Sequence, residues 1–361
     1  METKNLKKWK KEMLVCIRCA YCLENCPVYN QIGWESAGAR ARMILSYGLL
    51  TKDIECSDSI LEKFFQCTTC GQCEVNCPAK VKILEVVKAS RKDLVENGHY
   101  FPPHQLMQEA VKKSGNVYGE EKKEKEIIQK SAEYALFVGC VGTYREEESV
   151  NRTIKLLKKL GVSFTRFDEL CCGGVFPDLG FENYQENVQH NKEEIKKTGA
   201  KKLLTICPMC YKTFKNNPEY SDLGLEVVHI TQLLNKLNIQ VKTEEIVTYH
   251  DPCDLGRHSG IYEEPREIIK KFAPHFVEME KNRENARCCG AGGGVRGSFT
   301  RLSIDMAKDR LKEALDKKAD VLLTECFSCL HNFKNAKKRK QNIKIYNISE
   351  YLSILMEGGE K

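Results

Sequence analysis

The 361-residue sequence has no apolar run that approaches the roughly 18 residues needed to span a membrane. Its lysine-rich residues 1–11 lead into a cysteine motif, not into the apolar core and cleavage site of a secretory signal. The basic runs 4–11 and 334–340 lack the interleaved aromatic residues and fold signature of nucleic-acid-binding proteins. We therefore expect a cytoplasmic protein that binds no nucleic acid. The net charge of +7 leaves the basic runs as solvated faces or as docking sites for an acidic protein or an anionic membrane surface.

Cysteine, in contrast, is abundant. Nineteen cysteines in a chain without an expected export signal indicate a reducing compartment and metal ligation, not a framework of disulfides. All but one belong to repeated motifs. The leftover thiol, Cys56, precedes Ser57-Asp58-Ser59, and we expect it to lie in a loop or beside a helix cap with no ligand role.

The first hundred residues contain the spacing C-x2-C-x2-C-x3-C-P twice. Three closely spaced cysteines of this pattern hold one 4Fe-4S cubane, while the fourth ligates the cluster of the other motif. The pattern therefore predicts two 4Fe-4S clusters with crossed ligation. One set is Cys16, Cys19, Cys22 and Cys77, and the other is Cys26, Cys67, Cys70 and Cys73.

A second pattern, C...C-C-G...C-x2-C, occurs twice in the rest of the chain and indicates a tandem duplication with two equivalent metal sites. A structural zinc ion takes four ligands, so five cysteines per copy favour a larger iron-sulfur centre. A zinc site in each copy, or unliganded core cysteines, are the alternatives. The first set is Cys140, Cys171, Cys172, Cys207 and Cys210, and the second set is Cys253, Cys288, Cys289, Cys326 and Cys329.

The periodicity of apolar residues changes along the chain. Spacings of three and four residues predict helices over 37–50, 59–65 and 83–97, whereas strand-like and helical segments alternate after residue 133. The expected fold is an α-helical ferredoxin domain followed by an α/β domain made of two duplicated halves. The predicted boundaries are 1–100 for the ferredoxin domain, 101–132 for a charged linker, 133–245 for the first half and 246–361 for the second half.

In both halves the predicted strands lead into the cysteines, at the end where open parallel sheets place their binding sites. Two pseudo-equivalent halves would then face each other across one crevice. We expect strands over 134–138, from 164, and over 202–206, 246–249, 276–279 and 321–324, with helices over 149–160, 186–198, 264–272 and 302–318.

The combination of these cysteine patterns resembles the D-type catalytic subunit of heterodisulfide reductase and, in outline, the iron-sulfur subunits of glycolate and lactate oxidases. The resemblance covers residues 10–350. In the heterodisulfide reductase subunit each five-cysteine set holds a non-cubane 4Fe-4S cluster, and the substrate disulfide is cleaved between them. Since all ten cysteines are present, the resemblance implies two cubane and two non-cubane 4Fe-4S clusters. It also implies an archaeal, methanogenic role, in which the chain reduces the coenzyme M–coenzyme B heterodisulfide or a related disulfide. One departure is Asp254, where histidine is expected after Cys253.

The chemistry of disulfides agrees with this interpretation. Cleavage of an S–S bond takes two electrons, whereas an iron-sulfur cluster delivers one at a time. The expected route runs from a partner through the N-terminal clusters to paired centres that share the disulfide. The resemblance implies a membrane b-type cytochrome or a soluble flavoprotein as the donor. The alternatives are a non-catalytic electron-transfer subunit of a flavin-dependent glycolate/lactate-type oxidoreductase and a structural zinc scaffold.

Some other residues are candidates for roles beside the cysteines. Arg40 and Arg42 are suited to balance cluster charge, or else to form exposed ion pairs. Gly173-Gly174 and the segment 290–294 either let backbone N–H groups approach sulfides or an anion, or form plain tight turns. A dinucleotide-binding loop is not expected there, because the glycines follow a cysteine pair.

The remaining candidates are cationic or titratable. Arg257 and Arg296 are candidates for binding a sulfonate or phosphate of the substrate, with a structural or surface role as the alternative. His250 is a candidate for donating a hydrogen bond to a cluster sulfide or a leaving thiolate, with a structural role as the alternative. No role is expected for His229, His258 or His331.

Overall fold

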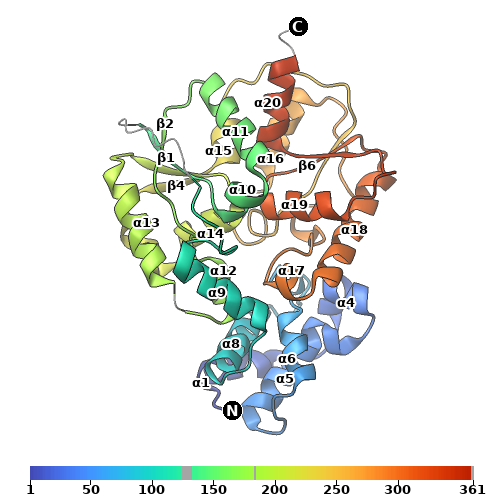
Figure 1. Ribbon diagram of the computed structural model, residues 1–361. Coiled ribbons are helices and arrows are strands. Elements are labelled where there is room, and N and C mark those ends of the chain that lie inside the picture. Colours follow the sequence, from blue (N-terminus) through green and yellow to red (C-terminus); the bar gives the residue numbers. More distant parts are fainter. Residues whose placement is uncertain (124–131, 183, 359–361) are drawn as a thin grey trace.

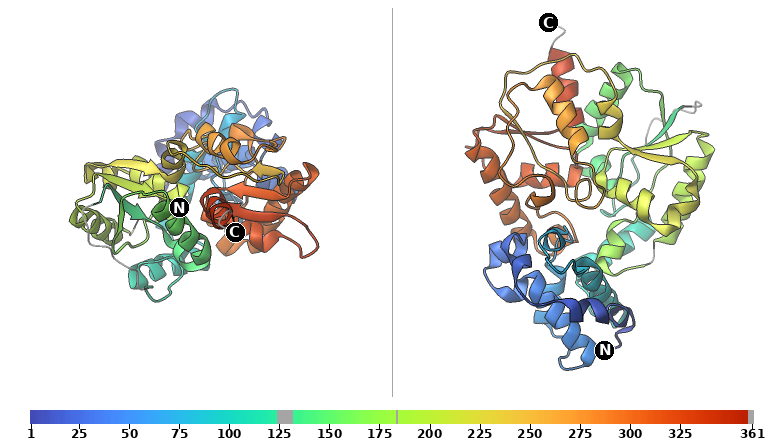
Figure 2. Two further views of the ribbon diagram at one scale, coloured as in Figure 1. Left: turned by 90° about the horizontal axis from the view of Figure 1, so that it is seen from above. Right: turned by 180° about the vertical axis from the view of Figure 1, so that it is seen from behind.

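The computed structural model describes residues 1–123, 132–182 and 184–358. Part of the predicted linker, residues 124–131, lies outside the described residues. A helical region at the N-terminus forms the lower end of the molecule, and two sheet-containing regions lie side by side above it (Figure 1). The views from above and from behind show the same arrangement (Figure 2).

Every residue from 1 to 123 is described, and none of them lies in a strand. The helices predicted over 37–50, 59–65 and 83–97 are present, and the glycine at position 98, with φ +82°, ends the last of them. The predicted linker begins with a helix of its own, because Pro102 and Pro103 occupy its first turn, where their missing N–H groups cost nothing. The helices are α1 (Lys4–Lys7), α2 (Lys10–Val15), α3 (Tyr21–Glu24), α4 (Pro27–Ile32), α5 (Ala39–Thr51), α6 (Asp58–Phe65), α7 (Gln72–Val75), α8 (Ile83–Glu96) and α9 (Pro102–Ser114), with a 3-10 turn at Glu35–Ala37.

The first sheet is parallel, with the strand order β2-β1-β3-β4. Its central strands are buried along nearly their whole length, as is typical of a parallel sheet covered on both faces. Helices connect the strands, as parallel pairing requires. The elements are β1 (Tyr134–Phe137), α10 (Cys140–Arg145), α11 (Glu147–Lys159), β2 (Phe164–Arg166), α12 (Val175–Leu179), α13 (Gln185–Lys197), β3 (Lys202–Thr205), α14 (Pro208–Asn216), β4 (Glu226–His229) and α15 (Ile230–Asn235), with a 3-10 turn at Pro218–Leu223.

The second sheet is also parallel, with the order β5-β6-β7. The expected strand over 276–279 is wrong: in the described part of the chain a single bridge joins Phe276 to Val247, and the Glu278 carboxylate beyond it accepts a hydrogen bond from Arg266. That bridge lies beside β5 as β2 lies beside β1. The elements are β5 (Val247–Tyr249), α16 (Glu263–Phe272), α17 (Val295–Ser298), α18 (Thr300–Asp316), β6 (Val321–Thr324), α19 (Phe327–Ala336), β7 (Lys344–Asn347) and α20 (Ile348–Gly358), with a 3-10 turn at Arg283–Asn285.

The two sheet-containing regions are joined by helices and not by a common sheet. Helix α11 packs along α20, and α10 packs against α19. The buried hydroxyls of Thr153 and Ser349 form a hydrogen bond of 2.9 Å in the α11–α20 contact. This packing holds the loops after the strands of one sheet against the corresponding loops of the other.

Candidate iron-sulfur centres

The first five-cysteine set lies in the loops that follow β1, β2 and β3, at the C-terminal ends of the strands. Cys140 begins α10, and Cys207 caps α14. Hydrogen bonds with Cys140 and Cys172 raise the pKa of the Cys171 thiol, and hydrogen bonds with Cys172 and Cys207 raise the pKa of Cys210. The five thiols therefore form one connected group in the order 140, 171, 172, 210, 207.

The second set repeats this connection in the same order. Hydrogen bonds with Cys253 and Cys289 raise the pKa of the Cys288 thiol, and hydrogen bonds with Cys289 and Cys326 raise the pKa of Cys329. Every cysteine of the chain is a free thiol. Two groups of five soft sulfur donors fit iron-sulfur centres better than four-coordinate zinc.

One open cavity of about 450 Å³ lies between the two sets. It is bounded on further sides by α9 and by the glycine-rich segment around residues 291–297. A molecule in this cavity would contact both sets at once. The cysteines that line it are Cys140, Cys171, Cys172, Cys207 and Cys210 of the first set and Cys253, Cys289, Cys326 and Cys329 of the second.

The N-terminal cysteines lie close together, and one of the two expected ligand sets shares a cavity. Cys26, Cys67, Cys70 and Cys73 line one small internal cavity, which Arg42 also borders. Burial, followed by the neighbouring Cys26, Cys16 and Cys19 thiols, raises the pKa of Cys22 to about 11. Cys77 follows α7, which packs against the helix α3 that carries Cys22.

The arginines near these groups have different partners. Arg42 is buried and donates to the carbonyl oxygens of Ala37 and Lys63, each at 2.7 Å. Arg40 forms an ion pair with Glu35. Cys56 directly precedes Ser57, whose hydroxyl caps α6, as the sequence predicts for this cysteine.

The N-terminal region meets the second set directly. A hydrogen bond with Cys288 is the main cause that lowers the pKa of the Cys70 thiol. Arg257 lies at the same junction and donates to the backbone oxygens of Cys70 at 2.6 Å and Ala286 at 2.7 Å. Of the two arginine candidates for substrate binding, Arg257 is thus committed to backbone contacts and does not line the cavity, whereas Arg296 does line it.

Three glycine positions are required by close packing. A side chain at Gly139 would approach the Cys210 sulfur to 2.9 Å. At Gly293, with φ +57°, a Cβ atom would lie 2.4 Å from the Cys67 carbonyl oxygen, and at Gly292 it would lie 2.7 Å from that of Thr68. The glycines of the second set therefore allow the N-terminal backbone to approach closely, a role that their sequence did not indicate.

His250 lies beside the second set and has no counterpart in the first. Its ring nitrogen lies within 4.8 Å of the ligand atoms of Cys289 and Cys329. Arg310 donates to His250 Nδ1 at 3.2 Å, so that Nε2 carries the hydrogen and faces the sulfurs. Aligning Cys140 with Cys253 places Phe137 at the corresponding position of the first copy. The two sites therefore differ by one hydrogen-bond donor.

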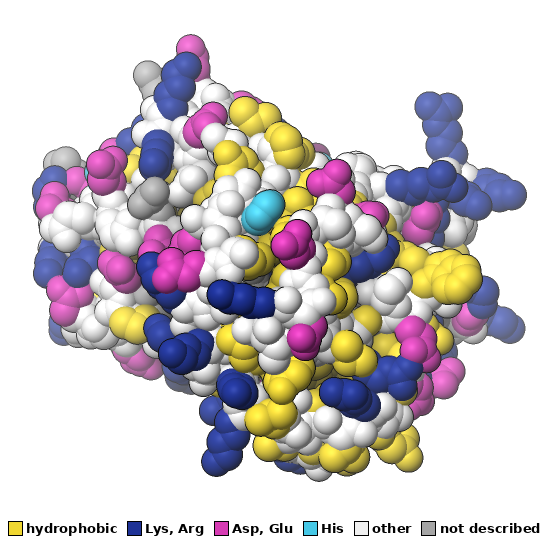
Figure 3. All heavy atoms as spheres, turned by 90° about the horizontal axis from the view of Figure 1, so that it is seen from below, with side chains coloured by type: hydrophobic (Ala, Val, Ile, Leu, Met, Phe, Trp, Pro, Cys, Tyr) yellow, Lys and Arg dark blue, Asp and Glu magenta, His cyan; other side chains and the backbone are white. Residues whose placement is uncertain are grey.

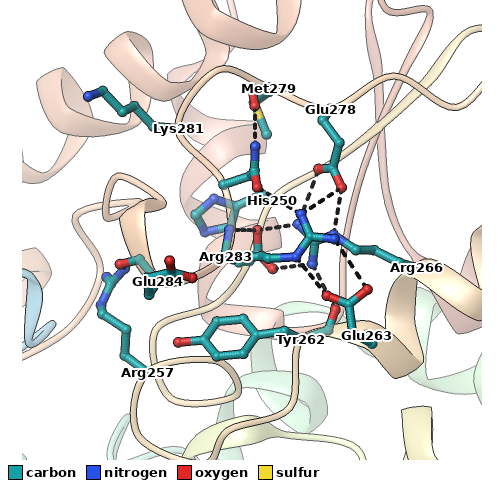
Figure 4. Close-up of polar contacts among 12 residues, drawn as sticks. His250, Arg257, Tyr262, Glu263, Arg266, Glu278, Met279, Lys281, Arg283 and Glu284 are labelled. Atoms are coloured by element: carbon teal, nitrogen blue, oxygen red, sulfur yellow. Dashed lines mark hydrogen bonds and ion pairs between the residues drawn. The ribbon is translucent and has the colours of Figure 1, made fainter. Parts of the chain in front are cut away.

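The loop between His250 and Cys253 is fixed by a buried ion pair. Arg266 binds both carboxylate oxygens of Asp251, at 2.7 and 2.9 Å, and also contacts Glu278 (Figure 4). The backbone N–H of Arg283 donates to the same Asp251 carboxylate at 2.9 Å. Asp251 is therefore a structural residue that holds the loop carrying Cys253.

The histidines for which no role was expected make structural contacts. His229 caps α15, His258 bonds to the carbonyl oxygen of Thr69, and His331 pairs with Glu146 at 2.8 Å. Asp254, the departure from the expected histidine, pairs at 2.7 Å with Lys212 of the first copy. Sequence reasoning missed Lys212, since nothing local to it marks a contact across the cavity.

No described helix is both long and apolar enough to cross a bilayer.

Comparison with known proteins gives the same division of the chain. The 4Fe-4S dicluster domain family matches residues 12–81, and the cysteine-rich domain family matches residues 134–215 and 247–334. A crystal structure of a hypothetical protein from Helicobacter pylori superposes with a TM-score of 0.64 over 98% of this chain and 72% of that one, at 12% identity, which shows a shared fold.

Among curated relatives, the D-type subunit of dihydromethanophenazine:CoB–CoM heterodisulfide reductase from Methanosarcina barkeri is 32% identical over 98% of this chain and 96% of its own length. EtfAB:quinone oxidoreductase of Syntrophomonas wolfei subsp. wolfei is 28% identical over 95% of this chain and 58% of its own length. The relatives are oxidoreductases, and the first is a subunit of a larger complex. The chain therefore belongs to the family of the D-type heterodisulfide reductase subunits, as an iron-sulfur oxidoreductase subunit with a 4Fe-4S dicluster domain and two cysteine-rich domains.

Proposed function

We propose that this chain is the catalytic iron-sulfur subunit of a disulfide reductase, and that the disulfide binds in the cavity between the two five-cysteine sets. The observation that carries the proposal is that both sets line the same cavity. A chain that only relayed electrons would need neither two complete sets nor a shared space between them.

The proposed ligands follow the observed groups. The N-terminal sets hold two cubane 4Fe-4S clusters, and each five-cysteine set holds one non-cubane 4Fe-4S cluster. When bound, such clusters supply electrons one at a time, which suits the two-electron cleavage of a disulfide at a cavity with two centres. The domain boundaries are proposed at residues 100, 132 and 245, so that the two later domains are duplicated halves.

The chain's own residues determine how a disulfide would be held. The loops after the strands bring the two sulfur groups to opposite sides of the cavity, and the α10–α19 contact keeps them there. Leu106, Met107 and Ala110 of α9 form an apolar wall that limits water around the bound molecule. The substrate is proposed to be the coenzyme M–coenzyme B heterodisulfide, because the Methanosarcina barkeri relative is named for it and matches nearly the whole chain.

Electrons are proposed to enter through the N-terminal region. Cys19 is exposed, and Leu14, Ile17 and Tyr21 around it are 61%, 67% and 60% exposed. On the face seen from below, hydrophobic side chains lie among charged side chains of both signs (Figure 3). An apolar patch with a charged border fits a partner subunit that docks there with its own redox group close by. A membrane b-type cytochrome is the proposed partner, which would bring the chain to the membrane, with a soluble flavoprotein as the alternative.

A second function has one observation in its favour. The relative from Syntrophomonas wolfei is named as an EtfAB:quinone oxidoreductase. An electron-transfer subunit of a flavin-dependent oxidoreductase, such as a glycolate or lactate oxidase, is therefore the alternative. The purified protein distinguishes the two, because only the reductase should use reduced viologen to cleave the heterodisulfide.

The test of the proposed function has three readouts. The protein should contain roughly sixteen irons per chain, four for each of four clusters. It should oxidise reduced viologen with the heterodisulfide, and thiol added to the oxidised protein should produce a paramagnetic signal. Full iron content with neither turnover nor signal would assign the chain to electron transfer alone, and four-coordinate zinc would reject both functions.

His250 should raise the reduction potential of the second centre relative to the first. The replacement His250→Phe, which copies Phe137, removes the imidazole N–H that lies near the sulfurs. The loss of this donor dipole destabilises the more negative, reduced centre more than the oxidised one. We expect the potential to fall by about 30–60 mV, a fraction of the value of a charged hydrogen bond. Redox titration followed by electron paramagnetic resonance measures the shift.

His275→Phe is the matched control for His250, because the His275 side chain is 56% exposed and pairs with the exposed Glu244. That variant should leave the potential unchanged. An equal shift in both variants, or none in His250→Phe, would show that the imidazole does not influence the centre.

A further inference from the structure

The shared cavity contains one cation that no carboxylate compensates. Arg296 extends from α17 and lines the cavity. Its Nη2 donates to the Tyr118 hydroxyl at 3.1 Å, whereas its buried Nη1 has no hydrogen-bond partner among the described residues. Within the described part of the chain, Arg296 forms no ion pair.

The charged side chains around Arg296 do not compensate its positive charge. Of the described residues that line the cavity, Asp254 is the only carboxylate, and it pairs with Lys212 at 2.7 Å. Arg145, which stacks on the ring of Tyr118 at 3.7 Å, has its own partner in Glu120 at 2.5 Å. Among the described lysine, arginine and carboxylate side chains in and beside the cavity, Arg296 is therefore left with an uncompensated charge.

Tyr118 makes the Arg296 end of the cavity a paired donor site. Its oxygen accepts from Arg296 Nη2, which leaves the phenol O–H free to donate to a neighbouring group. Together with the unpartnered Nη1, it provides two hydrogen-bond donors beside one positive charge. Such a fork-shaped site suits the oxygens of a carboxylate, sulfonate or phosphate.

The wall next to Arg296 is apolar. Leu106 is 62% exposed, although it is a large hydrophobic residue, and Met107, Ala110 and Val117 continue the same side of the cavity. An aliphatic chain would cover these side chains and remove them from water. The site thus offers an apolar surface and an anion-binding end, both in the space that the cysteines share.

We propose that Arg296, with Tyr118, binds an anionic group at the end of an aliphatic arm of the disulfide substrate. The inference rests on the proposed function, and it adds the residues that would select the substrate by its charge. Arg296 acts here as a specificity-determining residue: it binds substrate and takes no part in the redox step.

Three disulfides of similar size test this charge preference with the iron-loaded protein and reduced viologen. These are the anionic 3,3'-dithiodipropionate, the neutral bis(3-hydroxypropyl) disulfide and the cationic cystamine. The unmodified protein should prefer the anionic over the neutral disulfide by about tenfold or more in kcat/KM, and cystamine should be the poorest substrate. Arg296→Gln should raise KM for the anionic disulfide about tenfold or more and remove the preference, and Arg296→Lys should restore part of it.

Binding without turnover gives an independent readout. Calorimetry with 3-(methylthio)propionate, which has no disulfide to reduce, should show binding to the unmodified protein and a loss of about tenfold or more in Arg296→Gln. Arg301→Gln is the matched control, since the Arg301 side chain lies in the next helix and is 98% exposed. Unchanged iron content and circular dichroism would show that each variant is folded.

The possible outcomes distinguish a failure of the inference about Arg296 from a failure of the proposed function. If the protein reduces disulfides but Arg296→Gln keeps both the preference and the binding of 3-(methylthio)propionate, the inference about Arg296 is overturned and the proposed function stands. If no disulfide is reduced, the proposed function fails, and calorimetry still decides whether Arg296 binds the anion.

Discussion

Replacement of Cys289 by serine should abolish disulfide reduction, with a loss of more than about 100-fold, because even residues behind a metal ligand change activity by about 10- to 100-fold. Cys289 stands in the middle of the second set, where it is hydrogen-bonded to Cys288 and Cys329 and lies beside His250. Serine offers a hard oxygen where iron-sulfur centres require a soft thiolate. Iron content should fall by about four atoms per chain. The assay with reduced viologen measures the loss of disulfide reduction.

Cys56→Ser provides the control for this experiment. Cys56 belongs to neither N-terminal set and to neither five-cysteine set, and it precedes the cap of α6. The substitution should change neither iron content nor activity. The spectra of the N-terminal clusters should persist in Cys289→Ser, because their cysteines come from residues 16–77. Retained activity and full iron in Cys289→Ser would remove Cys289 from the ligand set.

The grouping of the cysteines could be predicted from the sequence because the spacing within each motif is local. Short loops after strands fix where Cys140, Cys207 and Cys210 lie, and parallel pairing of the strands then brings separate motifs together. The same reasoning located most helices and strands. It missed β4 and β7, which each begin with an exposed charged residue and end in a polar one, so that neither forms an apolar run.

The contacts between the three parts of the chain could not be predicted, because each joins residues far apart in the sequence. The Cys70–Cys288 contact and the close approach of Gly293 to the Cys67 carbonyl depend on how the N-terminal region docks. Of Arg257 and Arg296, only the fold shows which one faces the cavity. A comparison of the two copies does reveal one difference, since Phe137 aligns with His250 in the sequence itself.

Arg91 is the residue through which this docking is held. It lies in α8, is fully buried, and among the described residues donates to backbone oxygens alone. Its guanidinium reaches Phe64 at 2.8 Å and Cys67 at 2.5 Å in the N-terminal region, Asp178 at 2.6 Å in the first copy, and Gly293 at 3.2 Å in the second. The guanidinium of this one residue therefore connects the N-terminal region with both copies, next to the contact between Cys70 and Cys288.

Arg91→Met should accordingly destabilise the protein by about 3 kcal/mol or more, because it leaves several buried carbonyl oxygens without donors. The loss should appear as an earlier unfolding transition in denaturant, followed by circular dichroism and by the visible absorbance of the clusters. Arg301→Met removes the same charge at a side chain that is 98% exposed, and it should change stability by less than about 0.5 kcal/mol. Because Arg91 holds the N-terminal region against both copies, reduction of the five-cysteine centres by the partner subunit should slow as well. Equal stability of the two variants would show that the apolar contacts alone hold the three parts together.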